Sequence, residues 1–524
     1  YLLPYWQESV KRGMDREFAK EILKCFWMHC NFAYDAMIQT GNQGITAGYG
    51  QLFNISGMGK DGADMTNELT WLFLEVIDEM SPILEPKPNV RLHEHSPEEL
   101  LDKVVDMIAT SQGAPFLLNF DERSIAGMLE EAKRAGVEAL INEDTVFDYA
   151  SVGCLENTMC GNDRSATVDC NPNLVKAVEL ALGGGSDLIT YTDALWGKPY
   201  EEESEAPKTG DPRSFTTFEE FYQAFSTQLC YVIQRTVALY ERSTALRAEY
   251  APTPYLSCLV RGCADKALDC TQGGAELSFV TIEGVTFATT VDSLLAIKYL
   301  VFDQKLCDMD TLIKALKANW KGYEILLAHA KNRAPKYGRD DDAADALALR
   351  VMHDWTEEVW KHKTVSTKAQ YRPGMLSWNY WIGSGFVLPA TPDGRAHGQF
   401  LSNAICPVNG ADTNGPTGNA NSVGKALGGR NELGVMENML PNGASHTITL
   451  SPSLMRDQEH REKLKAFLKG YIHNGGTALQ INILDAEILK DAQLHPENYR
   501  NLLVRITGYN AYFTSIGREL QNEI

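Results

Sequence analysis

The stretches TALQINIL (477–484) and LLVRITGYNAYF (502–513) decide the fold expected for this chain. The first is mostly apolar, with five apolar residues of eight, and a short run of this kind predicts a buried strand. A helix is expected over 485–492, before a second apolar run at 502–506. Gly508 then stands between that run and a cluster of aromatic residues, where a glycine ordinarily supplies a turn at positive φ.

Helices alternate with short strands over the rest of the chain, and this alternation predicts an α/β fold. A short strand is expected within 138–153. The stretch 371–450 is rich in Gly, Pro, Asn and Ser and is too long for a passive linker. Helices are expected at 14–38, 66–80, 217–250 (with one break) and over most of 310–365.

Composition and charge exclude several classes of function. The chain has 524 residues, 44% of them hydrophobic, and its net charge of −21 argues against nucleic acids and anionic membranes as partners. No apolar run approaches the roughly 20 residues of a membrane helix. The 11 cysteines contain no paired CxxC set and the 11 histidines no metal-ligand spacing. We therefore expect no metal, no disulfide scaffold and a reduced, cytoplasmic location.

Three residues have a chemical interpretation beside the ordinary one. Gly508 can store an unpaired electron on Cα, since its amide nitrogen donates electron density, its carbonyl withdraws it and no side chain crowds the planar centre. The Cys154 thiol can become a thiyl radical that abstracts hydrogen from a substrate carbon. Glu156, two residues on, can take or return a proton. The ordinary alternatives are a turn glycine, a buried structural cysteine and a solvated surface acid.

These segments and their surroundings resemble a known family. VRITGYNAYF (504–513), followed by GRELQNEI, is similar to the radical-bearing loop R-V-x-G-Y-x-x-x-F of the glycyl radical enzymes, with Ile506 in the Val place. GCLE (153–156) is similar to the G-C-x-E cysteine loop of their dehydratase and decarboxylase branches. The resemblance extends over the whole chain and includes two further stretches, GCADKALDCTQGGA (262–275) and DGADMTN (61–67).

The resemblance implies a barrel of ten strands, built from two half-barrels and surrounded by helices, inside which the cysteine and glycine loops meet. Residues 1–385 would form the C-terminal part of the pyruvate formate-lyase-like barrel domain, and residues 386–524 the glycine radical domain. The chain begins at Tyr1. Because family members are usually longer on the N-terminal side, we expect it to start partway through their N-terminal domain.

The resemblance also implies the chemistry. A separate activating enzyme, which uses S-adenosylmethionine and an iron–sulfur cluster, would install the radical on Gly508, so no cofactor is expected to stay bound. The radical would take hydrogen from Cys154, whose thiyl attacks the substrate, while Glu156 manages the proton. An anaerobic, cytoplasmic homodimer is expected. A spare part that restores a damaged glycine domain is the non-enzymatic alternative, and the presence of the Cys154 loop argues against it.

Several stretches bear on the branch of the family. Cys154 is followed by a leucine, which argues against pyruvate formate-lyase with its two adjacent cysteines. We expect a C–C lyase that decarboxylates an arylacetate such as 4-hydroxyphenylacetate, indoleacetate or phenylacetate. Glu283, expected in the loop after the G-G-A stretch, would bind a ring hydroxyl, and an exposed turn acid before Gly284 is its ordinary alternative. Fumarate addition by an X-succinate synthase, and dehydration or another C–X cleavage, are the alternatives. The stretches that look most like the decarboxylases are GNDRSATVDCN (161–171), RPGMLSWNYW (372–381) and LSNAICPVNGAD (401–412).

Overall fold

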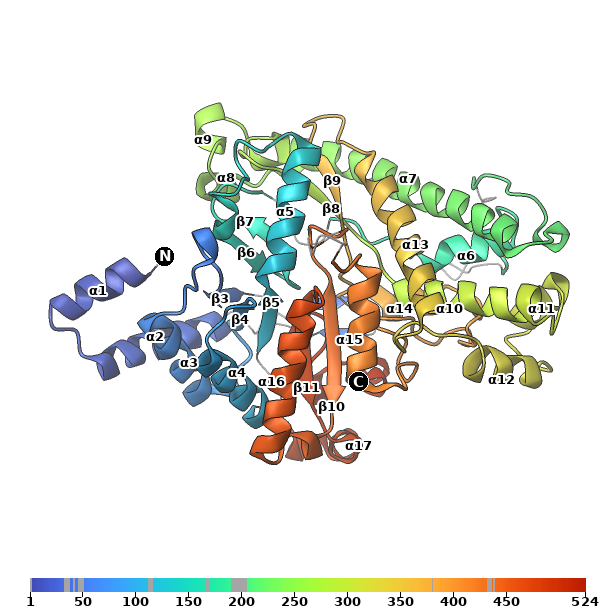
Figure 1. Ribbon diagram of the computed structural model, residues 1–524. Coiled ribbons are helices and arrows are strands. Elements are labelled where there is room, and N and C mark those ends of the chain that lie inside the picture. Colours follow the sequence, from blue (N-terminus) through green and yellow to red (C-terminus); the bar gives the residue numbers. More distant parts are fainter. Residues whose placement is uncertain are drawn as a thin grey trace. The chain divides into compact units, whose positions relative to one another are not determined.

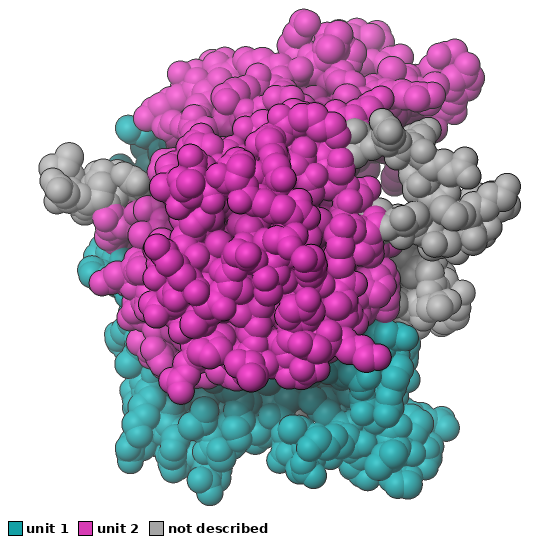
Figure 2. All heavy atoms as spheres, turned by 90° about the vertical axis from the view of Figure 1, so that its right-hand side faces the viewer, with its two compact units in different colours: residues 1–129, 141–158, 445–524 teal, residues 130–140, 159–444 magenta. Residues whose placement is uncertain are grey.

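The computed structural model contains two compact units (Figures 1 and 2). Unit 1 comprises Tyr1–Leu129, Ile141–Thr158 and Ser445–Ile524, and unit 2 comprises Glu130–Leu140 and Met159–Ala444. The structure describes residues 2–32, 38–40, 43–45, 51–111, 116–164, 169–189, 205–378, 380–430, 436 and 439–524.

A five-stranded mixed sheet organises unit 1. β10 (Ser445–Leu450) pairs in parallel with β11 (Ala478–Ile483), which pairs antiparallel with β5 (Leu117–Phe120). Parallel pairs then connect β5 to β4 (Lys87–Leu92) and β4 to β3 (Leu52–Ser56). Every residue of β4, β5 and β11 is buried, as in strands that are covered on both faces. The predicted buried strand is therefore β11.

Helices complete unit 1. α4 (Glu98–Thr110) and α16 (Gln458–His473) lie side by side (Figure 1). α3 (Glu68–Met80) begins at Asn67, whose side chain accepts a hydrogen bond from the Leu69 N–H and so caps the helix. The other elements are α1 (Leu3–Lys11), α2 (Arg16–Phe32), β1 (Ile38–Thr40), β2 (Gln43–Ile45), α17 (Ala486–Leu494) and α18 (Arg518–Glu523), and α5 (Asp121–Ala135) contains a unit boundary.

Unit 2 is mostly helical and contains two strands, β8 (Phe279–Glu283) and β9 (Gln370–Gly374), which pair in parallel. Three isolated parallel bridges, Asp163–Leu277, Cys170–Ile282 and Asn173–Val285, lie in β8 or beside its ends. Its helices are α6 (Val175–Leu182), α7 (Phe218–Tyr250), α8 (Pro254–Leu259), α9 (Cys263–Lys266), α10 (Phe287–Ile297), α11 (Met309–Lys317), α12 (Glu324–Asn332), α13 (Asp342–Trp360), α14 (Tyr380–Phe386) and α15 (Gly415–Ala426), with a π-helical turn at Lys298–Asp303.

The predicted α/β class is confirmed, with differences in detail. The strands of the described residues do not close into one ten-stranded ring, because they form the five-stranded sheet and separate two-stranded sheets. α7 runs unbroken over 33 residues, so the break expected within 217–250 is wrong. Residues 33–37, at the end of the helix expected over 14–38, lie outside the described residues. The Gly- and Asn-rich stretch 371–450 contains α15, whose composition did not predict a helix.

Three further features concern the described residues: membrane helices, metal sites and disulfides. Among the residues that the structure describes, no helix is both long enough and apolar enough to span a bilayer. No group of three or more His, Cys, Asp or Glu side chains in the same part of the chain is arranged to hold a metal ion. None of the 11 cysteines, all of which lie in described parts of the chain, forms a disulfide bond.

Candidate active site

Cys154 lies at the tip of a tight hairpin in unit 1, between β6 (Tyr149–Val152) and β7 (Glu156–Met159). The connection is only three residues long, and both residues that flank Cys154 are left-handed, Gly153 at φ 55° and Leu155 at φ 90°. A left-handed leucine is strained, so its surroundings must hold it in place. The Leu155 side chain is fully buried and packs in a cluster with Leu117 and Ala478.

Gly508 lies in a second hairpin of unit 1, between β12 (Leu503–Arg505) and β13 (Asn510–Tyr512). Arg505 pairs with Asn510, and the Ile506 N–H donates to the Tyr509 carbonyl at 3.0 Å, which closes the loop around Gly508. Gly508 has φ 72°, so the predicted positive-φ turn glycine is present.

The two hairpins meet at Cys154 and Gly508. A Cβ placed on Gly508 would lie 2.8 Å from the Cys154 Sγ and closer still to the Cys154 Cα and Cβ, so no side chain fits there. Cys154 is only 8% exposed. The loops therefore meet as predicted, and Cys154 lies directly against Gly508 in a site that is largely closed to bulk water. A hydrogen atom could pass between the two groups in a single step, since such transfers need the reacting atoms in contact.

Glu156 is the first residue of β7 and is fully buried. Its Oε2 accepts a hydrogen bond from the backbone N–H of Cys154 at 2.5 Å. The alternative of a solvated surface acid is therefore wrong, because the carboxylate lies inside the protein next to the thiol residue. Such a carboxylate is placed to accept or return a proton at the same site. The catalytic roles of Gly508, Cys154 and Glu156 remain predictions.

Two buried polar residues of unit 1 contact Gly508 and were not identified from the sequence. The Lys87 Nζ donates to the Gly508 carbonyl oxygen at 3.0 Å, and the Gly508 N–H donates to Gln480 Oε1 at 3.1 Å. Burial lowers the pKa of Lys87 and lowers the pKa of Arg505 to about 9. No signal in the sequence pointed to Lys87, because KPNVRL, with its lysine, asparagine and arginine, does not predict a strand that is buried throughout.

Glu283 belongs to unit 2 and ends strand β8. The expectation that it lies in a loop is wrong, because β9 pairs with its strand as far as Gly374. Its carboxylate is fully buried and accepts hydrogen bonds from the Leu376 N–H, at 3.1 Å, and from the Asn442 side-chain amide. Its substrate-binding role stays a prediction.

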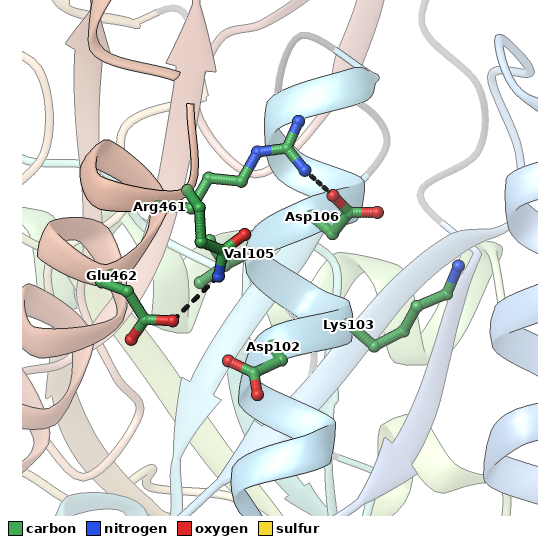
Figure 3. Close-up of a pocket in the computed structure, with 7 residues that line it drawn as sticks. Asp102, Lys103, Val105, Asp106, Arg461 and Glu462 are labelled. Atoms are coloured by element: carbon green, nitrogen blue, oxygen red, sulfur yellow. Dashed lines mark hydrogen bonds and ion pairs between the residues drawn. The ribbon is translucent and has the colours of Figure 1, made fainter. Parts of the chain in front are cut away.

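A surface pocket between α4 and α16 is not a second catalytic candidate (Figure 3). It is lined by Asp102, Lys103, Val105, Asp106, Gln458, Arg461 and Glu462. Arg461 forms an ion pair with Asp106, and Lys465 pairs with Asp102 at 2.5 Å. The charges at this face pair with one another across the two helices, which accounts for the cluster as a helix–helix contact.

Several curated proteins match this chain over its whole length. The chain is 32% identical to a trans-4-hydroxy-L-proline dehydratase from Clostridioides difficile, in a match that covers 100% of this chain and 63% of the relative. It is also 32% identical to an isethionate sulfite-lyase from Bilophila wadsworthia, of which it covers 60%. An indoleacetate decarboxylase from Tractidigestivibacter scatoligenes is more distant, at 25% identity with 59% of its length covered. The chain thus spans less than two thirds of these relatives.

Solved structures and family models agree with this result. A glycyl radical enzyme from Archaeoglobus fulgidus matches with a TM-score of 0.86 and 30% identity over 100% of this chain and 63% of its own. A structure from Roseburia inulinivorans, described in terms of 1,2-propanediol dehydration, matches with a TM-score of 0.87 and 28% identity. The match covers 100% of this chain and 63% of that protein. The glycine radical model matches residues 401–514. Because the pyruvate formate lyase-like model also matches residues 1–383, the chain belongs to the pyruvate formate-lyase-like glycyl radical enzymes.

Proposed function

We propose that this chain is the catalytic part of a glycyl radical lyase that cleaves a carbon–heteroatom bond, most simply as a dehydratase. The observation that carries the proposal is the buried contact between the Cys154 thiol and Gly508. The family membership of the chain supplies the chemistry for this contact, and its relatives at 32% identity are named a dehydratase and sulfite-lyases.

The proposed reaction begins when an activating enzyme with an iron–sulfur cluster and S-adenosylmethionine removes a hydrogen atom from the Gly508 Cα. The resulting carbon radical takes the hydrogen atom of the Cys154 thiol, so that a C–H bond forms and an S–H bond breaks. The thiyl then takes a hydrogen atom from a substrate carbon. A neighbouring hydroxyl or sulfonate leaves as water or sulfite, and the product radical recovers hydrogen from the thiol.

Glu156 is proposed to move the proton that this elimination requires. A carbon radical that carries a hydroxyl expels a neighbouring leaving group more readily once the hydroxyl has lost its proton. The Glu156 carboxylate is buried and bonded to the backbone of Cys154, which places a base next to the radical centre. The exclusion of bulk water from the site would also protect the radical intermediate from side reactions.

Decarboxylation of an arylacetate becomes the second candidate. The relative named for that reaction is only 25% identical, which is less than the dehydratase and sulfite-lyase relatives. One feature favours it: the typical dehydratase loop reads G-C-V-E-P, whereas Asn157 follows Glu156 here. In that reaction Glu283 would bind a ring hydroxyl. In an elimination the same carboxylate would bind a polar group of the substrate.

The test uses the complete protein, activated without oxygen by its radical S-adenosylmethionine partner. Electron paramagnetic resonance should show a glycyl doublet. The activated protein is then given trans-4-hydroxy-L-proline, glycerol, 1,2-propanediol, isethionate, (2S)-3-sulfopropanediol and the three arylacetates. We expect loss of water or release of sulfite from one of the aliphatic substrates, and no such product with Cys154→Ser or Gly508→Ala.

Other outcomes have definite meanings. An aromatic product released with CO₂ would replace the proposal by decarboxylation. A succinate adduct, formed only when fumarate is added with a hydrocarbon, would replace it by C–C bond formation. If the folded protein shows no glycyl doublet after treatment with its activating enzyme, glycyl radical catalysis is contradicted. The proposed homodimer is tested separately, by light scattering of the complete protein.

A further inference from the structure

We infer that Lys87 and Gln480 are positioning residues that stabilise the Gly508 radical by polarising the two peptide groups on either side of its Cα. This inference rests on the proposed function, since it concerns the radical that the proposal places on Gly508. The two contacts lie on opposite sides of the glycine. Gln480 accepts the Gly508 N–H at 3.1 Å, and the Lys87 Nζ donates to the Gly508 carbonyl oxygen at 3.0 Å.

The polarity of each contact matches the electronic demand of the radical. An electron on a glycine Cα is stabilised when the amide nitrogen supplies electron density and the carbonyl withdraws it. An acceptor on the N–H makes the nitrogen a better donor. A donor on the carbonyl oxygen makes the carbonyl a better acceptor. Because both partners are buried, at 0% exposure for Gln480 and 1% for Lys87, water does not screen the effect.

The surroundings fix the direction of the Gln480 contact. An amide side chain can turn either its oxygen or its nitrogen toward a neighbour. The Gln480 Nε2 donates to the Ser445 Oγ at 2.6 Å, so its oxygen is the atom left for the Gly508 N–H. Ser445 and Gln480 lie on the paired strands β10 and β11, which makes this a rigid support.

The surroundings also hold Lys87 beside the glycine loop. A lysine is rarely fully buried, because removal of its charge from water is costly unless a partner compensates. Glu85 Oε1 lies 3.9 Å from the Lys87 Nζ. The Asn510 amide donates to the Leu84 carbonyl at 3.3 Å, which ties the chain before β4 to the Gly508 hairpin. Both the charged and the neutral amine carry N–H donors, so the contact with Gly508 does not depend on the charge of Lys87.

The experiment compares activated complete proteins: wild type, Lys87→Met, Lys87→Arg and Gln480→Leu. Lysine labelled with ¹⁵N should give a weak nitrogen coupling to the wild-type radical in pulsed electron paramagnetic resonance, and Lys87→Met should abolish it. Loss of the donor should raise the spin density on the carbonyl oxygen and so increase the g anisotropy. The anaerobic half-life of the radical should fall about tenfold, the effect of losing one buried hydrogen bond. Lys87→Arg should keep most of the wild-type half-life. Gln480→Leu should shorten the half-life, but by less than Lys87→Met does.

Lys465→Met is the matched control, since Lys465 is a largely buried, ion-paired lysine on α16 of the same unit. It should change neither the spectrum nor the half-life. An absent ¹⁵N coupling in the wild-type radical, or a Lys87→Met radical with unchanged g anisotropy and half-life, would overturn the inference. If Lys87→Met does not fold, the inference is tested by the ¹⁵N coupling in the wild-type radical and by the radical half-life in Gln480→Leu. A wild-type protein without any radical would instead count against the proposed function.

Discussion

The hairpin that carries Cys154 and the hairpin that carries Gly508 meet at one point but are held there by different forces. The first is held mainly by packing, because the left-handed Leu155 is buried in an apolar cluster, beside the hydrogen bond that Glu156 accepts from the Cys154 N–H. The second is held by several buried hydrogen bonds between its backbone and side chains: Lys87 donates, and Gln480 and Asn482 accept. Packing sets the place of a side chain, whereas hydrogen bonds also set the electron distribution of the peptide they touch. The difference suits a thiol that must be aimed and a glycine that must hold a radical.

Gly508→Ala should have the largest effect on this contact. It removes the radical site and places a methyl group against Cys154, so we expect no glycyl doublet, no turnover and a marked loss of thermal stability. Gly62→Ala is the matched control, because Gly62 has φ 74° and an empty space where its Cβ would lie. It should cost only the backbone term of about 1–2 kcal/mol. If both substitutions destabilise the protein equally, the two hairpins are not in close contact.

Cys154→Ser should separate formation of the Gly508 radical from turnover of the substrate. The Gly508 radical should still form, because the glycine loop keeps all its own hydrogen bonds, but turnover should vanish since an O–H bond is much stronger than an S–H bond. The doublet and product formation are measured in the same sample. Cys160→Ser, at an exposed position a few residues on, should leave both unchanged. Turnover by Cys154→Ser would show that another residue relays the radical.

Glu156→Gln tests the proton role of the Cys154 hairpin. The amide oxygen can still accept the Cys154 N–H, so the fold and the radical should persist, while kcat should fall about 10²–10⁴-fold, the usual contribution of a positioned acid or base. Glu283→Gln should act mainly on KM, as expected of a group that binds substrate. Equal kcat losses in the two variants would mean that Glu283 also takes part in the proton transfer.

Leu155→Ala should have the smallest effect on the chemistry. Removal of a fully buried leucine should lower the free energy of unfolding by about 2–5 kcal/mol, as measured by denaturant unfolding. Leu246→Ala, at a side chain that is 52% exposed, should change it little. We expect the radical yield to stay high and kcat to fall modestly, because only the aim of the thiol is loosened. A lower radical yield would show that the Cys154 hairpin also supports the glycine loop.

Local patterns were sufficient wherever a residue acts through its neighbours in the chain. The apolar run at 477–484 forms β11, and Gly508 adopts the positive φ that a turn between an apolar run and an aromatic cluster suggested. Where composition conflicts with context, prediction fails. α15 forms from GPTGNANSVGKA, which contains three glycines, two asparagines and a proline, because buried packing outweighs weak helix propensity. Glu283, expected in a loop before a glycine, ends a buried strand.

The sequence alone indicated the family and the two residues proposed to react, because those depend on residue types at close spacing: G-C-x-E in one stretch and R-x-x-G-Y in the other. It could not show that Lys87 and Gln480 lie on either side of Gly508. Lys87 is far from Gly508 along the chain and reaches it only because β4 belongs to the same sheet as β11. Chain folding alone makes such contacts, since the energy that brings the strands together comes from burying their apolar neighbours and leaves no pattern at the lysine itself.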